Sequence, residues 1–263
     1  MTSPLPRLVG MVHLLPLPGS PRFAGSINDV VATAETDAQT LVEAGFPALI
    51  VENFGDAPFH ADSVPPVTIA AMTRAVSRVV DIGVPVGVNV LRNDALAAVG
   101  IAAATDASFI RVNVLTGLMY TDQGPIVGRA AELQRSRRSL APDVEVWADV
   151  MVKHSSPPPG ADIGQNAVDT VERGLADAVI VSGSGTGSPL DPDEAALVKN
   201  SVPVGTRIVA GSGVDSKNLD RMLESVDTFI VGSSLKVGGD PSNRPDPLRV
   251  KAFVELAAER GLV

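Results

Sequence analysis

The sequence contains no cysteine, which excludes disulfide bonds, thiolate metal sites and cysteine nucleophiles. Aromatic residues make up only 3% of the chain, too few to favour a large protein-binding hot spot. The longest nearly continuous apolar run, residues 95–104, is about half of what a bilayer span requires and is flanked by Asp94 and Asp106. We therefore expect no transmembrane helix. The N-terminal residues also lack the pattern of a secretory signal, so we expect a cytoplasmic protein.

Positive charge is scarce as well. Lysine and arginine number 21 against 30 aspartates and glutamates, a formal net charge of −9. Binding to a nucleic-acid backbone needs clustered cations. The only basic run, Arg135, Arg137 and Arg138, is typical of a solvated helix face. No nucleic-acid partner is expected.

What the sequence does have is a regular alternation of short apolar, β-branched runs and Ala-rich amphipathic stretches. The apolar runs predict eight strands, each followed by a helix such as the one from near Asn28 to Gly45 or from Pro247 to Gly261. This alternation indicates a mostly parallel sheet covered by helices. We predict a single-domain (β/α)8 TIM barrel over residues 1–263, with an open doubly wound sheet as the alternative. The expected strands span residues 7–14, 48–54, 85–91, 109–115, 144–150, 178–183, 207–212 and 228–234.

Polar residues gather where these strands should end. In a (β/α)8 barrel the carboxyl ends of the strands carry the reactive groups. A buried arginine such as Arg111 needs a carboxylate, and Glu52 or Asp149 is available for a structural ion pair or a functional one. We predict a polar pocket here, with a substrate-binding set that comprises Asn89, Arg92, Arg111, Asn113 and Thr186. Thr186 belongs to the segment 182–189, rich in glycine and serine, which we interpret as a ligand-approach loop, a mobile lid or a plain flexible loop.

Two Gly-Ser turns follow the seventh and eighth expected strands. A phosphate needs several converging backbone N–H groups, which glycine-lined turns supply, and (β/α)8 barrels often bind phosphate at this place. Tight turns that simply require glycine are the alternative. Asp215 would repel an anion unless its side chain caps the following helix. The predicted phosphate ligands are Gly211, Ser212, Gly213, Gly232, Ser233, Ser234 and Lys236.

Candidates for chemistry follow the fifth expected strand. His154, downstream of Asp149, is our first choice for proton transfer, with loop anchoring as the alternative. Lys153 would suit a Schiff base if burial depressed its pKa, although an exposed lysine is equally compatible with the sequence. Glu52 and His13 complete the catalytic candidates. No cofactor is certain. Glu52, Asp56, Asp149 and His13 could together hold a divalent metal, but no tight spacing motif supports one.

The stretches "GMVHLLPLPGSP", "VENFGDAPF", "GVNVLRNDA", "FIRVNV", "TDQG", "WADVMVKH", "IVSGSGTG", "GSGV" and "VGSSLK" resemble the BtpA/SgcQ family of (β/α)8 proteins. The resemblance runs from about Gly10 to Phe253 and implies the barrel fold independently of the periodicity. One branch of this family is associated with photosystem I biogenesis as a membrane-peripheral factor, and another with a sugar-metabolism gene cluster. The resemblance supplies no settled catalytic residues.

Two functions of different classes follow. The first is an enzyme that acts on a small phosphorylated metabolite, an isomerase or lyase of the sugar-phosphate type. The second is a noncatalytic assembly or stability factor for a membrane complex, with peripheral membrane association. The polar, glycine-lined pocket favours the enzyme, while fold alone licenses no reaction. A homo-oligomer is expected in either case.

Overall fold

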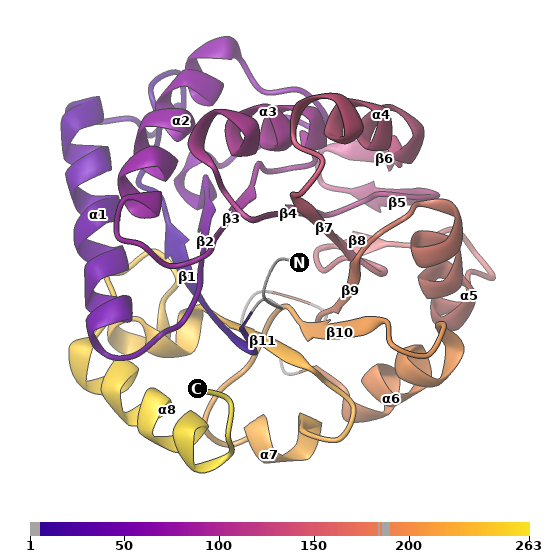
Figure 1. The fold of residues 1–263 in the computed structure, drawn as a ribbon. Coiled ribbons are helices and arrows are strands. Elements are labelled where there is room, and N and C mark those ends of the chain that lie inside the picture. The colour runs from indigo at the N-terminus through magenta and orange to yellow at the C-terminus, as the bar shows by residue number, and fades with distance from the viewer. Residues whose placement is uncertain (1–5, 184, 186–189) are drawn as a thin grey trace.

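A computed structural model describes residues 6–183, 185 and 190–263. Its parallel strands close into a barrel, because β1 pairs with both β2 and β11 (Figure 1). This confirms the predicted (β/α)8 barrel over the open sheet. Around the barrel the order is β1 (Leu8–His13), β11 (Thr228–Val231), β10 (Arg207–Ala210), β9 (Ala178–Val181), β7 (Glu145–Asp149), β4 (Phe109–Val112), β3 (Val86–Asn89) and β2 (Leu49–Glu52).

Helices surround this barrel as an outer layer (Figure 1). Acidic or hydroxyl side chains cap several of them, as at Ser26, whose hydroxyl and Asp29 form a reciprocal capping box. No helix in the described part of the chain is both long and apolar enough to cross a membrane. The layer comprises α1 (Ile27–Glu43), α2 (Pro66–Val80), α3 (Ala95–Thr105), α4 (Ala130–Leu140), α5 (Ile163–Val168) with the π-helical η2 (Asp169–Arg173), α6 (Pro192–Ser201), α7 (Leu219–Met222) and α8 (Pro247–Glu259).

The barrel interior is apolar below its open end. Alternate strand residues fill it, and the rings of Phe109 and Trp147 stack there with centroids 4.1 Å apart. Gly87 faces this stack, and a Cβ at that position would lie 2.2 Å from Cε2 of Phe109. The space that glycine leaves open is therefore used by an aromatic ring. Polar residues begin only in the next layer, at the carboxyl ends of the strands.

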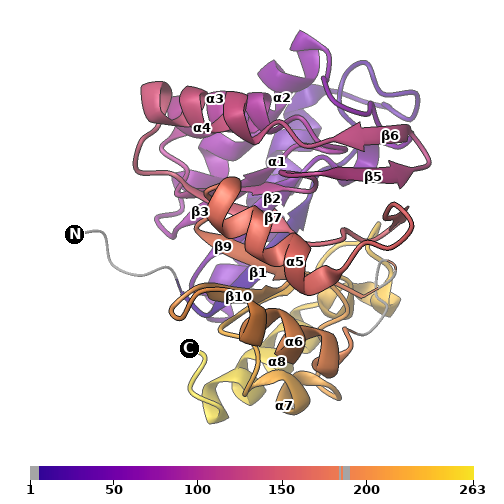
Figure 2. The same cartoon turned by 90° about the vertical axis from the view of Figure 1, so that its right-hand side faces the viewer.

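One feature was not expected from the sequence. A small antiparallel sheet of β6 (Gly124–Val127), β5 (Leu118–Thr121) and β8 (Ser155–Ser156) lies beside the barrel. Figure 2 shows β5 and β6 at the end of the barrel opposite to the C-terminus. The segment that follows β7 pairs with β5 through residues 155–156. This pairing fixes the chain that leaves β7 at the rim of the barrel mouth.

Candidate functional site

A buried ion pair joins two neighbouring strands at the barrel mouth. Nε and Nη2 of Arg111 each donate to one oxygen of Asp149 over 2.8 Å, and the two side chains are 2% and 0% exposed. Asn113 Nδ2 and Ser182 Oγ donate to the same carboxylate over 3.2 and 3.3 Å. Of the two predicted partners of Arg111, Asp149 is thus the one bound. These four hydrogen bonds hold the Asp149 carboxylate and the Arg111 guanidinium in a fixed relative position.

A second polar pair, Glu52 and His13, lies at the ends of β2 and β1. Glu52 Oε2 accepts a hydrogen bond from Asn89 Nδ2 over 2.6 Å, and Oε1 lies 3.8 Å from His13 Nε2. Nδ1 of His13 donates to the carbonyl oxygen of Pro241 over 2.9 Å, so the lone pair of Nε2 faces Glu52. Burial lowers the pKa of His13 to about 4, against the opposing effect of Glu52. His13 is therefore neutral at pH 7, and a substrate hydroxyl or N–H would fit between the two acceptors.

Lys153 lies in the same mouth, on the segment after β7. Nη2 of Arg92 donates to the Lys153 carbonyl over 2.6 Å, which holds this segment in place. Burial lowers the pKa of the Lys153 ammonium, and the nearby charge of Arg111 adds to the effect. A pKa lowered by burial is the condition under which we expected Lys153 to suit a Schiff base. His154 is exposed overall. The partial desolvation of its ring lowers its pKa most, and the positive charges of Lys153 and Arg92 lower the pKa further.

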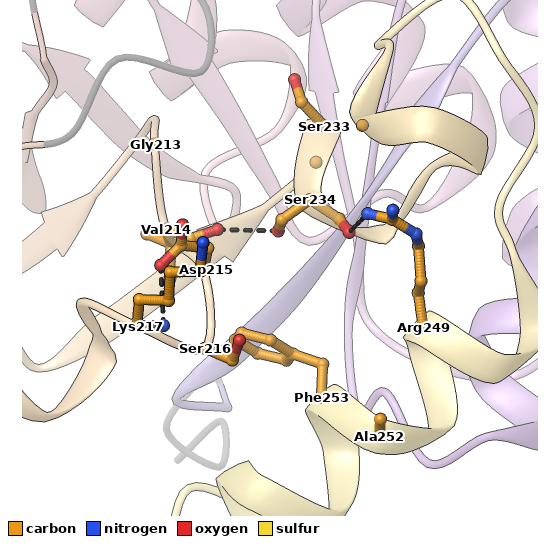
Figure 3. A pocket seen from close by; sticks show the side chains of 12 residues that line it. Gly213, Val214, Asp215, Ser216, Lys217, Ser233, Ser234, Arg249, Ala252 and Phe253 are labelled. Atoms are coloured by element: carbon orange, nitrogen blue, oxygen red, sulfur yellow. Dashed lines mark hydrogen bonds between the residues drawn. The ribbon is translucent and has the colours of Figure 1, made fainter.

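The two Gly-Ser turns enclose a hollow of about 430 Å³ with α8 (Figure 3), which we call the anion cradle. No hydrogen bond within the described part of the chain occupies the backbone N–H groups of Gly213, Ser233 and Ser234. Lys217 and Arg249 add positive charge to the lining, although the sequence analysis singled out neither. The full lining is Gly213, Val214, Asp215, Ser216, Lys217, Gly232, Ser233, Ser234, Gly239, Arg249, Ala252 and Phe253.

Side chains within the cradle hold its two loops together. Ser234 Oγ donates to the carbonyl of Val214 over 2.7 Å, and Arg249 Nη1 donates to the carbonyl of Ser234 over 3.4 Å (Figure 3). Asp215 Oδ1 accepts the backbone N–H groups of Lys217 and Asn218 over 2.8 and 3.0 Å. Its carboxylate therefore caps the next turn, the arrangement under which an acidic residue here is compatible with an anion.

One expected phosphate ligand, Lys236, lies outside the described lining of the cradle. The short 3₁₀ helix η3 (Ser233–Leu235) turns the chain between the cradle and this lysine. The Lys236 side chain is only 1% exposed, and its Nζ lies 4.0 Å from Oδ2 of Asp37 on α1, next to the Arg244–Asp37 pair. Burial lowers the pKa of Lys236 to about 8. The residue belongs to the packing of α1 and is absent from the described lining of the cradle.

Gly211 and Ser212 line a narrower central hollow of about 30 Å³. It adjoins the cradle through Gly213, Gly232 and Ser233, and its other lining residues include His13, Glu52, Arg111 and Lys153. The turns after β10 and β11 thus lead directly to the charged residues of the mouth. Thr186 lies outside the described residues.

A third hollow of about 370 Å³, the distal hollow, adjoins the central one. The two share Glu52, Phe54, Arg111 and Lys153. Most of its polar residues were predicted as site residues. Phe54 and Phe59 were not singled out and stand only within the family motif "VENFGDAPF". Asp122 was not predicted, because it lies in the unexpected β5–β6 turn. The lining is Glu52, Phe54, Phe59, Leu91, Arg92, Arg111, Asn113, Asp122, Lys153 and His154.

The metal site left open by the sequence has no geometric support. No group of three or more His, Asp or Glu side chains in the described part of the chain could hold a metal ion. Asp56 accepts hydrogen bonds from Leu17 N over 2.7 Å and Asn53 Nδ2 over 3.1 Å, which anchor a loop. Asp149 is bound to Arg111. The carboxylates considered for a metal thus serve other partners.

Comparisons with known proteins identify the family of this chain. The model of the BtpA family matches residues 6–259. The photosystem I biogenesis protein BtpA of Synechocystis sp. is 47% identical, covering 96% of this chain and 88% of that protein. An uncharacterized protein of Thermococcus kodakarensis is 48% identical, covering 96% and 95%.

Solved structures similar to this one are barrel enzymes of low sequence identity. Thiamine phosphate pyrophosphorylase from Pyrococcus furiosus has a TM-score of 0.57 at 14% identity, covering 96% of both chains. Phosphoribosyl anthranilate isomerase from Thermus thermophilus has a TM-score of 0.58 at 11% identity, covering 97% of this chain and 99% of that one. These likenesses show the fold.

Proposed function

The chain belongs to the BtpA family, and we propose that it is an enzyme acting on a small phosphorylated metabolite, an isomerase or lyase of the sugar-phosphate type. The observation that carries this proposal is the continuity of the anion cradle with the charged mouth. Gly213, Gly232 and Ser233 line both the cradle and the central hollow. A phosphate held in the cradle would place the attached carbon chain among Glu52 and Lys153.

The cradle has the chemistry of a phosphate site. Backbone N–H groups of Gly213, Ser233 and Ser234 are available to an oxyanion, and Lys217 and Arg249 supply charge. Such donors bind phosphate without the cost of reorganising long side chains. Two structural neighbours, by their names, handle phosphorylated compounds, as a thiamine phosphate pyrophosphorylase and a phosphoribosyl anthranilate isomerase do.

The mouth has groups suited to proton transfer next to a carbonyl. An enzyme that isomerises or cleaves a sugar phosphate needs a base that removes a proton and a group that stabilises the oxyanion formed at the carbonyl. In this proposal Glu52 accepts the proton and neutral His13, whose Nε2 lies 3.8 Å from Glu52 Oε1, relays it. Lys153 and Arg111 are the cations next to that space and would stabilise the oxyanion.

A binding screen with matched ligands tests this proposal. Purified protein is heated with ribose 5-phosphate, other sugar phosphates and their dephosphorylated counterparts, and the midpoint of thermal unfolding is recorded. We expect stabilisation by phosphorylated members only. Ser233→Asp, which puts a carboxylate in the cradle, should abolish that stabilisation, while Ser77→Asp on the exposed face of α2 should retain it. Equal shifts with both members of each pair, or no shift with any, would contradict the proposal.

The second candidate is an assembly factor for a membrane complex. Its support is the name of the 47% identical photosystem I biogenesis protein BtpA. This support is weak, because a relative of similar identity, 48%, from Thermococcus kodakarensis is uncharacterized. In this case the protein would sediment with lipid vesicles and show no stabilisation by phosphorylated ligands. Light scattering after size-exclusion chromatography would test the expected homo-oligomer under either function.

A further inference from the structure

The distal hollow lies across the barrel mouth from the anion cradle. In the closed order of strands, β4 is opposite β11 and β3 is opposite β10. The cradle is built on the turns after β10 and β11, whereas the distal hollow is built on the ends of β2, β3, β4 and β7. The narrow central hollow connects the two. A ligand that fills all three must therefore be an extended molecule whose phosphate is at one end.

The size of the distal hollow indicates a sizeable group at the other end. Its volume of about 370 Å³ falls within the range of ~300–1,000 Å³ that is usual for pockets that enclose small organic ligands. A simple sugar phosphate anchored in the cradle would reach the central hollow and leave this space to water. The protein keeps a partly apolar chamber there, at the far side from the phosphate.

Aromatic side chains line that chamber in a chain that has few of them. Phe54 and Phe59 are two of only seven phenylalanines, and both are partly exposed at the hollow. Phe54 is held in place by stacking on His13, with ring centroids 4.5 Å apart. Leu91 extends the apolar wall. Partly exposed rings of this kind bind flat π systems by stacking.

Buried polar groups in the same wall have unused hydrogen-bonding capacity. Asn113 is 2% exposed, and its Nδ2 is committed to Asp149, which fixes the orientation of the amide. Its Oδ1 is buried with no hydrogen-bond partner in the described part of the chain. Arg92, 5% exposed, uses Nη2 for the Lys153 carbonyl and retains further N–H donors. The wall therefore offers an acceptor and charged donors to the edge of a ring, as a nitrogen heterocycle requires.

From these observations we propose that the substrate is a phosphorylated sugar joined to a flat nitrogen heterocycle, a molecule of the nucleoside monophosphate class. The phosphate lies in the anion cradle and the heterocycle in the distal hollow against Phe54 and Phe59. The sugar spans the narrow central hollow between them, which at about 30 Å³ encloses only part of a ribose ring. This inference rests on the proposed function and narrows its substrate class. It also assigns the distal hollow as the ring-binding subsite.

Isothermal titration calorimetry tests the proposal with ribose 5-phosphate, AMP, CMP and adenosine as probes. We expect a monophosphate to bind at least ~10-fold more tightly than ribose 5-phosphate, because stacking of a base on an aromatic side chain adds affinity. Phe59→Ala should remove this preference and leave the affinity for ribose 5-phosphate unchanged. Phe59→Trp, which keeps a ring at the position, should retain the preference. Circular dichroism of each variant checks that the fold persists.

The outcomes separate this inference from the function on which it rests. Equal affinity for ribose 5-phosphate and both monophosphates, or a preference that survives in Phe59→Ala, would overturn the ring subsite and leave the phosphate enzyme standing. If no phosphorylated probe binds, the proposed function fails. The titration with adenosine then tests by itself whether the distal hollow binds a ring. Adenosine binding that is lost in Phe59→Ala supports the ring subsite, and no adenosine binding overturns it.

Discussion

The two sides of the barrel mouth are built from different parts of the polypeptide. At β10 and β11 the anion cradle presents backbone N–H groups from turns whose residues carry little or no side chain, such as Gly213 and Ser233. Across the mouth the surface is made of charged side chains, among them the buried Arg111–Asp149 pair and the partly buried Lys153. One side depends on the absence of side chains, the other on their pairing.

This difference determines how each side fails. Backbone donors are rigid and carry no formal charge, so their main requirement is space for the chain and the ligand to approach. Buried charges lose their hydration on folding and stay tolerable only with partners in good geometry. We therefore expect substitutions at the charged side to act mainly on folding and those at the glycine side to act through local packing and binding.

Removing the arginine of the buried pair should have the largest effect. Arg111→Met leaves Asp149 buried with only Asn113 and Ser182 as hydrogen-bond donors. The loss of a partner from a buried ion pair costs about 3–5 kcal/mol in the free energy of unfolding. Urea denaturation measures it, with the fluorescence of Trp147, the single tryptophan, as the probe.

A double variant separates the pair from the volume of its side chains. Arg111→Met combined with Asp149→Leu removes both charges, and we expect it to regain most of the stability lost in the single variant. A single variant within about 1 kcal/mol of the unaltered protein would show that Asp149 needs no cation, and would remove the contrast between the two sides.

The charged side should also make stability depend on pH through His13. Its pKa is lowered by burial from 6.5 to about 4 in the folded protein. Between these values the unfolded chain takes up a proton that the folded protein does not, so stability is complete above pH 6.5 and falls as the pH drops toward 4. The shift corresponds to about 3 kcal/mol. Urea denaturation at pH 7.5 and 4.5 measures the loss.

The charges that act on the pKa of His13 are Glu52, which raises it, and Lys236 and Lys153, which lower it. His13→Asn has its side-chain amide N–H close to the position of Nδ1, so it keeps a hydrogen-bond donor for the Pro241 carbonyl but cannot be protonated. Because pH 4.5 still lies above the folded pKa, the difference between the two pH values should shrink by about 2–3 kcal/mol in this variant. An undiminished pH dependence in His13→Asn would place the responsible group elsewhere.

At the glycine side the effect should be smaller and steric. A Cβ at Gly211 would lie 2.3 Å from Cγ2 of Ile180 and 2.9 Å from Ser182 Oγ, so Gly211→Ala forces these side chains apart. We expect a loss of about 1–3 kcal/mol in thermal or urea denaturation. Gly100→Ala in α3 is the matched control: a Cβ there meets nothing within 4 Å, and alanine should stabilise the helix by about 0.5–1 kcal/mol. Equal effects of the two substitutions would show that space at Gly211 is not limiting.

Sequence reasoning located the framework of this mouth because the signals were local. The eight strand positions follow from apolar runs, and polar residues such as Glu52, Arg111 and Asp149 interrupt those runs at the strand ends. The β5–β6 hairpin escaped because strands of four residues joined by a two-residue turn carry too little periodicity to distinguish them from a loop. Its turn nevertheless brings Asp122 to the distal hollow.

The residues that line the cradle could not all be identified without the three-dimensional structure. Lys217 follows β10 and Arg249 lies in the first turn of α8, and the fold brings both segments to the hollow beside the Gly-Ser turns. No spacing rule connects them to Ser233. The placement of Lys236 could not be predicted either, since the orientation of a side chain after a 3₁₀ turn depends on the backbone path and on Asp37, which is far away in the sequence.

The smallest expected effect is at this lysine. Because Nζ of Lys236 faces Asp37, which Arg244 continues to neutralise, Lys236→Met should change the affinity for ribose 5-phosphate by less than ~2-fold. Lys217→Met removes a cation that does line the cradle and should weaken binding by ~3–10-fold, the range of a partly screened charge contact. Calorimetric titration of both variants compares them directly. A larger loss in Lys236→Met than in Lys217→Met would mean that a buried cation holds the anion and that Lys236 is a phosphate ligand after all.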